Sequence, residues 1–239
     1  MAQHVGIVGC SAEGAALCYR TLCLEGEPVF GPHGHPEVSL HSHPLGAYME
    51  HIHRHDWAAV GELMLDSAGK LARAGADFLI CPDNTIHEAL PAILARSPLP
   101  WLSIAEVVTE EAARRAYRRL GITGTRFLVA SEVYPRALDK RHLQYQRPTA
   151  EECTEVDRII MEELVRGVFA PAAVAYLQSV IRRMAEGGCD AVVLGCTEIP
   201  LLIGDHNSLL PTLDSTRLLA RAALRRAVAP LPSPPAATG

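Results

Sequence analysis

The chain has 239 residues, of which 49% are hydrophobic and 21% charged, and its formal net charge is −5. This composition is typical of a globular protein, and the negative charge argues against binding to nucleic acids or anionic membranes. No apolar run approaches the ~18 residues of a transmembrane helix, the N-terminus lacks a signal-peptide pattern, and seven scattered cysteines indicate reduced thiols in the cytoplasm.

Short apolar runs alternate with amphipathic segments along the chain. Strands are predicted at residues 4–8, 38–41, 78–81, 101–104, 120–123, 143–146 and 191–194. Helices are predicted at residues 57–74, 109–118, 128–139, 150–166, 172–186 and 215–228. Strands that alternate with helices indicate an α/β fold with parallel sheets buried on both faces. The tail, residues 229–239, contains four prolines and predicts disorder.

An internal repeat divides the chain into two halves. Residues 71–77 and 184–190 each combine a helix end, a glycine and an aspartate, followed by a buried strand. Two further pairs, 6–10 with 121–125 and 100–103 with 211–214, follow in the same order at nearly the same spacing. The register of the repeat aligns Asp83 with Cys196, Asn84 with Thr197 and Thr85 with Glu198.

The repeat predicts two pseudo-symmetric, doubly wound α/β lobes. We assign residues 1–104 and 214–228 to the N-terminal lobe and residues 105–213 to the C-terminal lobe. Ligands of open α/β sheets bind at the carboxyl ends of the strands. Two facing lobes would therefore enclose a site between Asp83 and Cys196.

Motifs at these strand ends resemble the aspartate/glutamate racemase superfamily over roughly residues 4–228. They are Gly6-Ile-Val-Gly9, Asn84-Thr85-Ile-His87, Gly124-Thr125-Arg126, Leu194-Gly-Cys-Thr-Glu-Ile-Pro200 and Asp214-Ser-Thr216. The resemblance implies a cofactor-independent enzyme of two α/β lobes with the active site in the cleft between them. It also implies two residues, often both cysteines, that flank the substrate α-carbon. One removes the α-proton and the other returns a proton on the opposite face.

Carried over residue by residue, the resemblance assigns the second catalytic position to Cys196, between Gly and Thr-Glu. The first position, just before Asn-Thr, holds Asp83 instead of cysteine. Cys81 lies two residues earlier, where the repeat aligns Leu194, and we interpret it as the end of a strand.

Cys196 is a suitable acid or base on physical grounds. A thiol has a reference pKa of ~8.5, which falls near a helix N-terminus. Pro200 and the apolar run after it predict a helix that starts close by and favours the thiolate. The alternative is a small buried cysteine of the core, the usual place of this residue type.

Asp83 can serve as the opposing base. A carboxylate beside a thiolate in a closed cleft has its pKa raised, which leaves one partner protonated and one ionised, as a two-base reaction needs. The alternative is a helix N-cap or Asx turn in Pro82-Asp83-Asn84. The site then has one chemical residue, and a one-base enzyme of this fold would decarboxylate or isomerise its substrate.

Other polar side chains at the strand ends are expected to bind the substrate carboxylate and to spread the charge that develops when the α-proton leaves. They are Ser11, Asn84, Thr85, Thr125 and Thr197. Ordinary turn and cap chemistry is the alternative for each of them. Glu198 and His87 are expected to orient these groups, and His87 is a candidate for proton exchange.

Seven of the eleven histidines fall within residues 33–55. His51 and His55 have the i, i+4 spacing of a metal pair on one helix face, but the motif of a metalloprotease is missing. We therefore expect no metal or other cofactor, and interpret the segment as a polar lid from which a histidine or Tyr48 reaches the substrate. Arg54 is the nearest candidate for a residue that grips a side-chain carboxylate.

The sequence thus predicts a racemase or epimerase that acts on amino acids without pyridoxal phosphate. Its alternatives are a decarboxylase or cis–trans isomerase that uses Cys196, and a binding protein for small molecules without catalysis. A dinucleotide site and a serine hydrolase are disfavoured, because residues 6–14 miss the glycine spacing of both motifs. The expected partner is an amino acid or related carboxylic acid, and a homodimer stays open.

Overall fold

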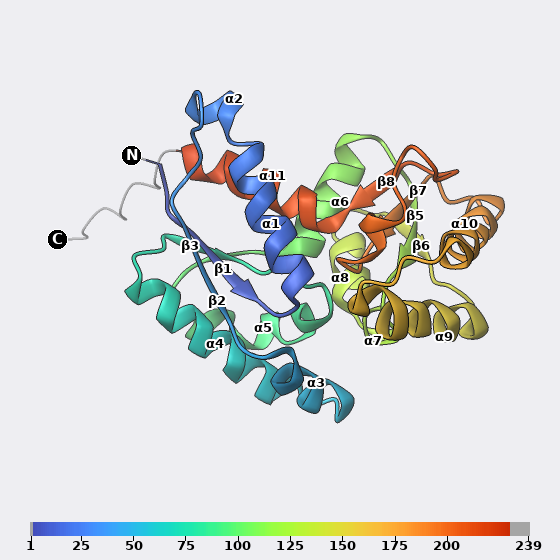
Figure 1. Ribbon diagram of the computed structural model, residues 1–239, viewed down its shortest axis with the longest axis horizontal. Coiled ribbons are helices and arrows are strands. Elements are labelled where there is room, and N and C mark those ends of the chain that lie inside the picture. The colour runs from blue at the N-terminus through green and yellow to red at the C-terminus, as the bar shows by residue number, and fades with distance from the viewer. Residues whose placement is uncertain (1, 230–239) are drawn as a thin grey trace.

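Residues 2–229, which the computed structural model describes, form two α/β lobes that lie next to each other (Figure 1). Each lobe contains a four-stranded, fully parallel sheet. The first sheet has the order β2-β1-β3-β4, with β1 Val5–Gly9, β2 Val38–Ser42, β3 Phe78–Ile80 and β4 Trp101–Leu102. The second has the order β6-β5-β7-β8, with β5 Arg119–Thr123, β6 Gln144–Gln146, β7 Ala191–Leu194 and β8 Thr212–Asp214.

The two sheets repeat one topology, so the predicted fold class of two similar α/β lobes is confirmed. The segments matched by the internal repeat lie on or directly before equivalent strands, β1 with β5, β3 with β7 and β4 with β8. Strand β8 was not predicted, because its apolar pattern is too short to recognise: the strand has three residues and ends at the polar Asp214. The lobe boundaries themselves stay a prediction.

The N-terminal sheet is buried on both faces, as parallel sheets usually are. Alternate residues of β1 enter different cores: Val5 and Ile7 pack with residues of α1, and Val8 packs with residues of α4. The helical segments of this lobe are α1 Ala12–Leu24, α2 Glu27–Phe30, α3 Leu45–His53, α4 Trp57–Arg73, η1 Thr85–Glu88, α5 Leu90–Ile93 and η2 Leu94–Arg96.

Helices also cover the C-terminal sheet, and the last helix returns to the first lobe, where it lies along α1 (Figure 1). The segments are α6 Ile104–Arg114, α7 Arg126–Ala130, α8 Val133–Asp139, α9 Ala150–Arg158, η3 Ile159–Glu163, η4 Leu164–Arg166, α10 Pro171–Glu186, η5 Ile199–Leu201 and α11 Ser215–Val228. Helix α6 packs against both α11 and α8 and so joins the lobes. None of the helices within residues 2–229 is long and apolar enough to span a membrane.

Several predicted helix bounds were wrong for local reasons. Helix α6 begins at Ile104, five residues early, because the Ser103 hydroxyl caps its first turn. The predicted helix 128–139 breaks at Ser131, which is extended. The predicted helix 150–166 is α-helical only to Arg158, after which η3 has π-helical geometry and the segment stops at left-handed Gly167. The predicted disorder of residues 230–239 lies outside the described residues.

Candidate active site

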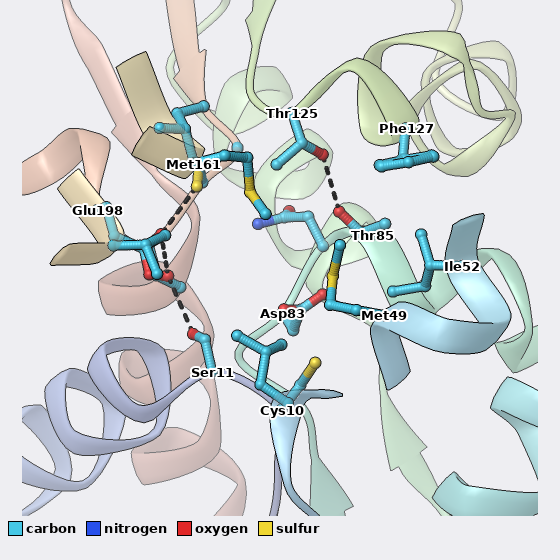
Figure 2. Close-up of a pocket in the computed structure, with 17 residues that line it drawn as sticks. Cys10, Ser11, Met49, Ile52, Asp83, Thr85, Thr125, Phe127, Met161 and Glu198 are labelled. Carbon is cyan, nitrogen blue, oxygen red and sulfur yellow. Dashed lines mark hydrogen bonds between the residues drawn. The ribbon is translucent and has the colours of Figure 1, made fainter. Parts of the chain in front are cut away.

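A cleft of about 600 Å³, including the space at its mouth, lies between the lobes where the strands end (Figure 2). Cys10 and Ser11 reach it after β1, Asp83 after β3, Thr125 after β5 and Cys196 after β7. The full lining consists of Cys10, Ser11, Leu45, Met49, Ile52, Asp83, Asn84, Thr85, Thr125, Phe127, Ile160, Met161, Val165, Gly195, Cys196, Thr197 and Glu198. The two predicted acid/base residues thus line one cleft from opposite lobes.

Cys196 is buried at the base of the C-terminal half of the cleft, with 8% of its surface exposed. Its thiol donates a hydrogen bond to Glu198 Oε2 over 2.8 Å. Burial, and after it the negative charge and hydrogen bond of Glu198, raise the pKa of the Cys196 thiol well above its usual value. The predicted lowering by a helix N-terminus is wrong, because η5 is a three-residue turn with almost no dipole.

Glu198 joins the cysteine to neighbouring hydroxyl groups. The same Oε2 atom accepts a hydrogen bond of 2.7 Å from Thr197 Oγ1, which lies 3.3 Å from Ser11 Oγ in the other lobe. The lobes approach closely here: a Cβ atom on Gly14 would lie 2.6 Å from the Thr197 methyl group. Glycine is therefore required in the first turn of α1, and Glu198 holds Cys196 and Thr197 by hydrogen bonds.

Asp83 occupies the facing position after β3, partly buried. Its Oδ1 atom accepts a hydrogen bond of 3.1 Å from the Ile86 backbone, so the residue also caps the turn η1. Burial raises the pKa of Asp83 and outweighs the lowering by hydrogen bonds from the Ile86 backbone and the Cys10 thiol. The turn interpretation is therefore correct for Asp83, and the same carboxylate lines the cleft.

Cys10 is the polar residue of the cleft that sequence reasoning missed. It directly follows β1, is 4% exposed, and lines the cleft together with Asp83. Burial and the nearby Asp83 charge raise the pKa of the Cys10 thiol. The signal was available, because the match of residues 6–10 with 121–125 aligns Cys10 with Thr125, a predicted site residue.

Asn84 and Thr85 connect the two lobes beneath the cleft. The Asn84 amide donates to Ser215 Oγ over 2.9 Å and accepts a hydrogen bond of 2.8 Å from the Tyr134 hydroxyl. The hydroxyls of Thr85 and Thr125 lie 3.1 Å apart (Figure 2). The Asn84 side chain thus donates one hydrogen bond and accepts one hydrogen bond within the protein, and the second of its two amide hydrogens is left for a ligand.

The other predicted carboxylate-binding side chains also have structural partners. Ser11 Oγ accepts from the Gly14 backbone at the start of α1, and Thr125 Oγ1 accepts from the Leu128 backbone at the start of α7. A hydroxyl that accepts one bond still has a proton to donate. The cap interpretation is therefore correct for both residues, and both still line the cleft.

His87 does not line the cleft, and both of its ring nitrogens are occupied. Nε2 accepts a hydrogen bond of 3.2 Å from the Ile104 backbone, so Nδ1 carries the proton and donates to the Asp83 carbonyl over 2.6 Å. Burial lowers the pKa of His87 to about 4. A neutral ring with both nitrogens bonded cannot exchange protons with a substrate, but it holds the Asp83 loop in place.

The predicted polar lid was wrong. Residues 45–53 form helix α3, which turns Leu45, Met49 and Ile52 into the cleft. Tyr48 is fully buried and does not line it, and Arg54 is exposed in an ion pair with Glu50. The helical spacing i, i+4, i+7 explains why the apolar residues, and not the histidines, face the site.

The histidine-rich segment does contain a close group of metal-ligating types. Among residues 2–229, the ligand atoms of His41, His43 and Asp66 lie within 4.8 Å of one another. Lys70, however, already donates a hydrogen bond of 2.6 Å to the Asp66 oxygen that also contacts His43. The pair His51 and His55 is separated by the end of α3, so it does not present two ligands from one helix.

A model of the Asp/Glu/Hydantoin racemase family matches residues 7–223. The chain belongs to this family. A broad specificity amino-acid racemase of Bacillus subtilis is 23% identical over 192 residues, which cover 78% of this chain and 80% of that protein. A glutamate racemase of Thermus thermophilus is 30% identical over 70% of this chain and 62% of its own length. Both relatives are named as racemases, and racemases are isomerases.

Two solved structures of the family have the same fold over almost the whole chain. An Asp/Glu racemase candidate from Yersinia pestis superimposes with a TM-score of 0.87 at 26% identity, covering 95% of this chain and all of that one. An aspartate racemase homologue from Pyrococcus horikoshii gives a TM-score of 0.82 at 25% identity, covering 94% and 99%. These matches show that the likeness to the family includes the arrangement of both lobes and is not limited to the sequence motifs.

Proposed function

We propose that this protein is a cofactor-independent amino-acid racemase or epimerase in which Asp83 and Cys196 are the acid/base pair. The observation that carries the proposal is their placement at equivalent positions of the two lobes, lining one cleft. A planar carbanion held between the lobes would have one of these residues on each face. The family membership and the names of the relatives support the same reaction class.

In one direction, the Asp83 carboxylate removes the α-proton and the electron pair of the C–H bond spreads into the substrate carboxylate. The Cys196 thiol then delivers its proton to the opposite face of the α-carbon. The products are the other enantiomer, a protonated Asp83 and a Cys196 thiolate. Burial favours this starting state, because it keeps Cys196 protonated and makes Asp83 a stronger base than a free carboxylate.

In the other direction, Cys196 begins as a thiolate and Asp83 begins protonated, which is the state that the first direction leaves behind. The thiolate removes the α-proton and Asp83 returns its proton to the opposite face. Glu198 Oε2 is within hydrogen-bond distance of the sulfur, so it can relay the Cys196 proton when the two states interconvert between turnovers. Glu198 therefore acts as a positioning residue that also supplies a route for the proton. Hydrogen bonds from Asn84, Thr85, Thr125 and Thr197 would stabilise the charge that develops on the substrate carboxylate.

Solvent exchange tests this function directly. The protein is incubated in D2O with L- and D-amino acids, and the α-hydrogen signal is followed by NMR together with the ratio of enantiomers. We expect deuterium at the α-carbon and formation of the other enantiomer for at least one amino acid. Tight binding without exchange would favour a binding protein, and release of CO2 from a related dicarboxylic acid would favour a decarboxylase.

A further inference from the structure

One side of the cleft carries three apolar side chains from two different elements. Helix α3 contributes Met49 and Ile52, and Phe127 follows from the start of α7. Figure 2 shows these three side chains on one side of the view, with Glu198 and Ser11 on the other. These three side chains form the apolar half of the cleft, which also carries the hydroxyl pair of Thr85 and Thr125, and they offer a surface against which a substrate side chain can pack.

The C-terminal lobe adds three further apolar side chains to the cleft through an unusual segment. Ile160 and Met161 lie on the π-helical turn η3, and Val165 lies on the 3₁₀ turn η4 that follows. A π-turn inserted in a helix is frequently found at functional sites, because it turns side chains in a direction that a regular helix does not reach. Here the π-turn directs Ile160 and Met161 to the cleft, and the 3₁₀ turn after it adds Val165.

Charge gives a second, independent observation. Among residues 2–229, no lysine, arginine or histidine lines the cleft, whereas two carboxylates, Asp83 and Glu198, do. Three basic side chains around it have partners of their own: Arg126 stacks on the Phe127 ring and contacts Asp157, and Arg54 pairs with Glu50. His43 lines a neighbouring pocket that shares Ser11 and Glu198 with the cleft, and its ring contacts Asp66. A second carboxylate on the substrate would find no cation here and would be repelled by two carboxylates.

We propose, on the basis of the function proposed above, that the substrate carries an apolar side chain such as that of leucine, methionine or phenylalanine, and not a carboxylate. Methionine side chains are unbranched and flexible, so Met49 and Met161 can adjust to apolar groups of different shape. The cleft therefore accepts several apolar amino acids and discriminates against aspartate and glutamate by charge.

The test compares exchange rates in D2O for leucine, methionine and phenylalanine with those for aspartate, glutamate and lysine, using both enantiomers. We expect kcat/KM for the best apolar amino acid to exceed that for either acidic one by at least about tenfold. Faster exchange of aspartate or glutamate would overturn the substrate class but leave the racemase function intact.

Calorimetric titration with leucine and glutamate separates binding from chemistry. Binding of leucine without exchange of any amino acid would contradict the racemase function while supporting the apolar subsite. Failure to bind leucine together with the absence of exchange would contradict both proposals.

A variant that adds a positive charge to the cleft tests the proposed substrate class directly. Met49→Arg places a cation in the apolar half, so the ratio of kcat/KM for glutamate over leucine should rise by at least about tenfold. Ala58→Arg, at an exposed position of α4 outside the cleft, is the matched control and should leave the ratio unchanged. Met161→Arg repeats the test from the other lobe. An unchanged ratio in both folded cleft variants would contradict the proposal.

Discussion

The thiol of Cys196 is hydrogen-bonded to the carboxylate of Glu198, two residues further along the same loop. The contact joins a proton donor directly to a group that can receive its proton, within a buried part of the cleft. It also means that the thiol, and not the thiolate, is the resting form of Cys196, since burial and the Glu198 charge both raise its pKa.

Substituting Glu198 should therefore change the acidity of Cys196. In Glu198→Gln the negative charge is lost and burial remains, so the pKa of the Cys196 thiol falls towards its ordinary value. We expect kcat to drop roughly 10²-fold, because the amide cannot carry the Cys196 proton as the Glu198 carboxylate does. The pH dependence of thiolate absorbance, with Cys196→Ser as the blank, measures the shift. An unchanged titration would mean that Glu198 is a packing residue only.

Cys196→Ser should reduce racemisation by roughly 10²- to 10⁴-fold in both directions, because a hydroxyl is a much weaker acid than a thiol. The fold should persist, since serine is of similar size and can still donate to Glu198. Cys23→Ser, a partly exposed cysteine outside the cleft, is the matched control and should keep full activity. Comparable turnover in the two variants would remove Cys196 from the mechanism.

Asp83→Asn should separate exchange from racemisation. The amide keeps an oxygen that can cap η1 but cannot take a proton, so racemisation should fall roughly 10²- to 10⁴-fold. The loss must be equal in both directions, because the enantiomers have the same free energy. Only the enantiomer whose α-proton faces Cys196 should continue to exchange it with D2O. Full racemisation by this variant would reduce Asp83 to a turn residue.

Cys10 should set the pH at which Asp83 becomes active. Its thiol lowers the pKa of Asp83 by a hydrogen bond, so Cys10→Ala should raise that pKa. Asp83 acts as a base only when ionised, and activity is lost as the pH falls through its pKa. The acidic limb of the kcat/KM profile should therefore move to higher pH in Cys10→Ala. It should move less in Cys10→Ser, which keeps a donor. A limb that is the same in all three proteins would contradict this assignment.

His87 should make the protein sensitive to acid through its stability. Its pKa is about 4 in the folded state and ~6.5 when unfolded, so the unfolded chain binds more protons between these values. The neutral ring thus contributes up to roughly 3 kcal/mol above pH 6.5, which is lost as the pH falls towards 4. Urea unfolding across this range should show a flatter dependence in His87→Asn. His53→Asn, an exposed control on α3, should follow the parent protein.

The sequence was sufficient to predict the two lobes and the facing of Asp83 and Cys196, because the repeat carries the strand register. It did not predict α1 or α3. Gly14 weakens the pattern of α1, and its role is visible only when Thr197 packs against it from the other lobe. The partners of Asn84 were also beyond sequence reasoning, since Ser215 lies 131 residues away in the chain and Tyr134 belongs to the other lobe.

The repeated strand order has a consequence for stereochemistry. Enantiomers are related by reflection, and a protein made of L-residues cannot contain a mirror plane. The two faces of a flat carbanion, however, are also exchanged by a half-turn about an axis in its plane. Two lobes of one topology, related by such a pseudo-twofold axis, would present equivalent loops to those two faces. The loop after β3 carries Asp83 and the loop after β7 carries Cys196, so the two loops differ in chemistry. The half-turn would still exchange their positions relative to the substrate.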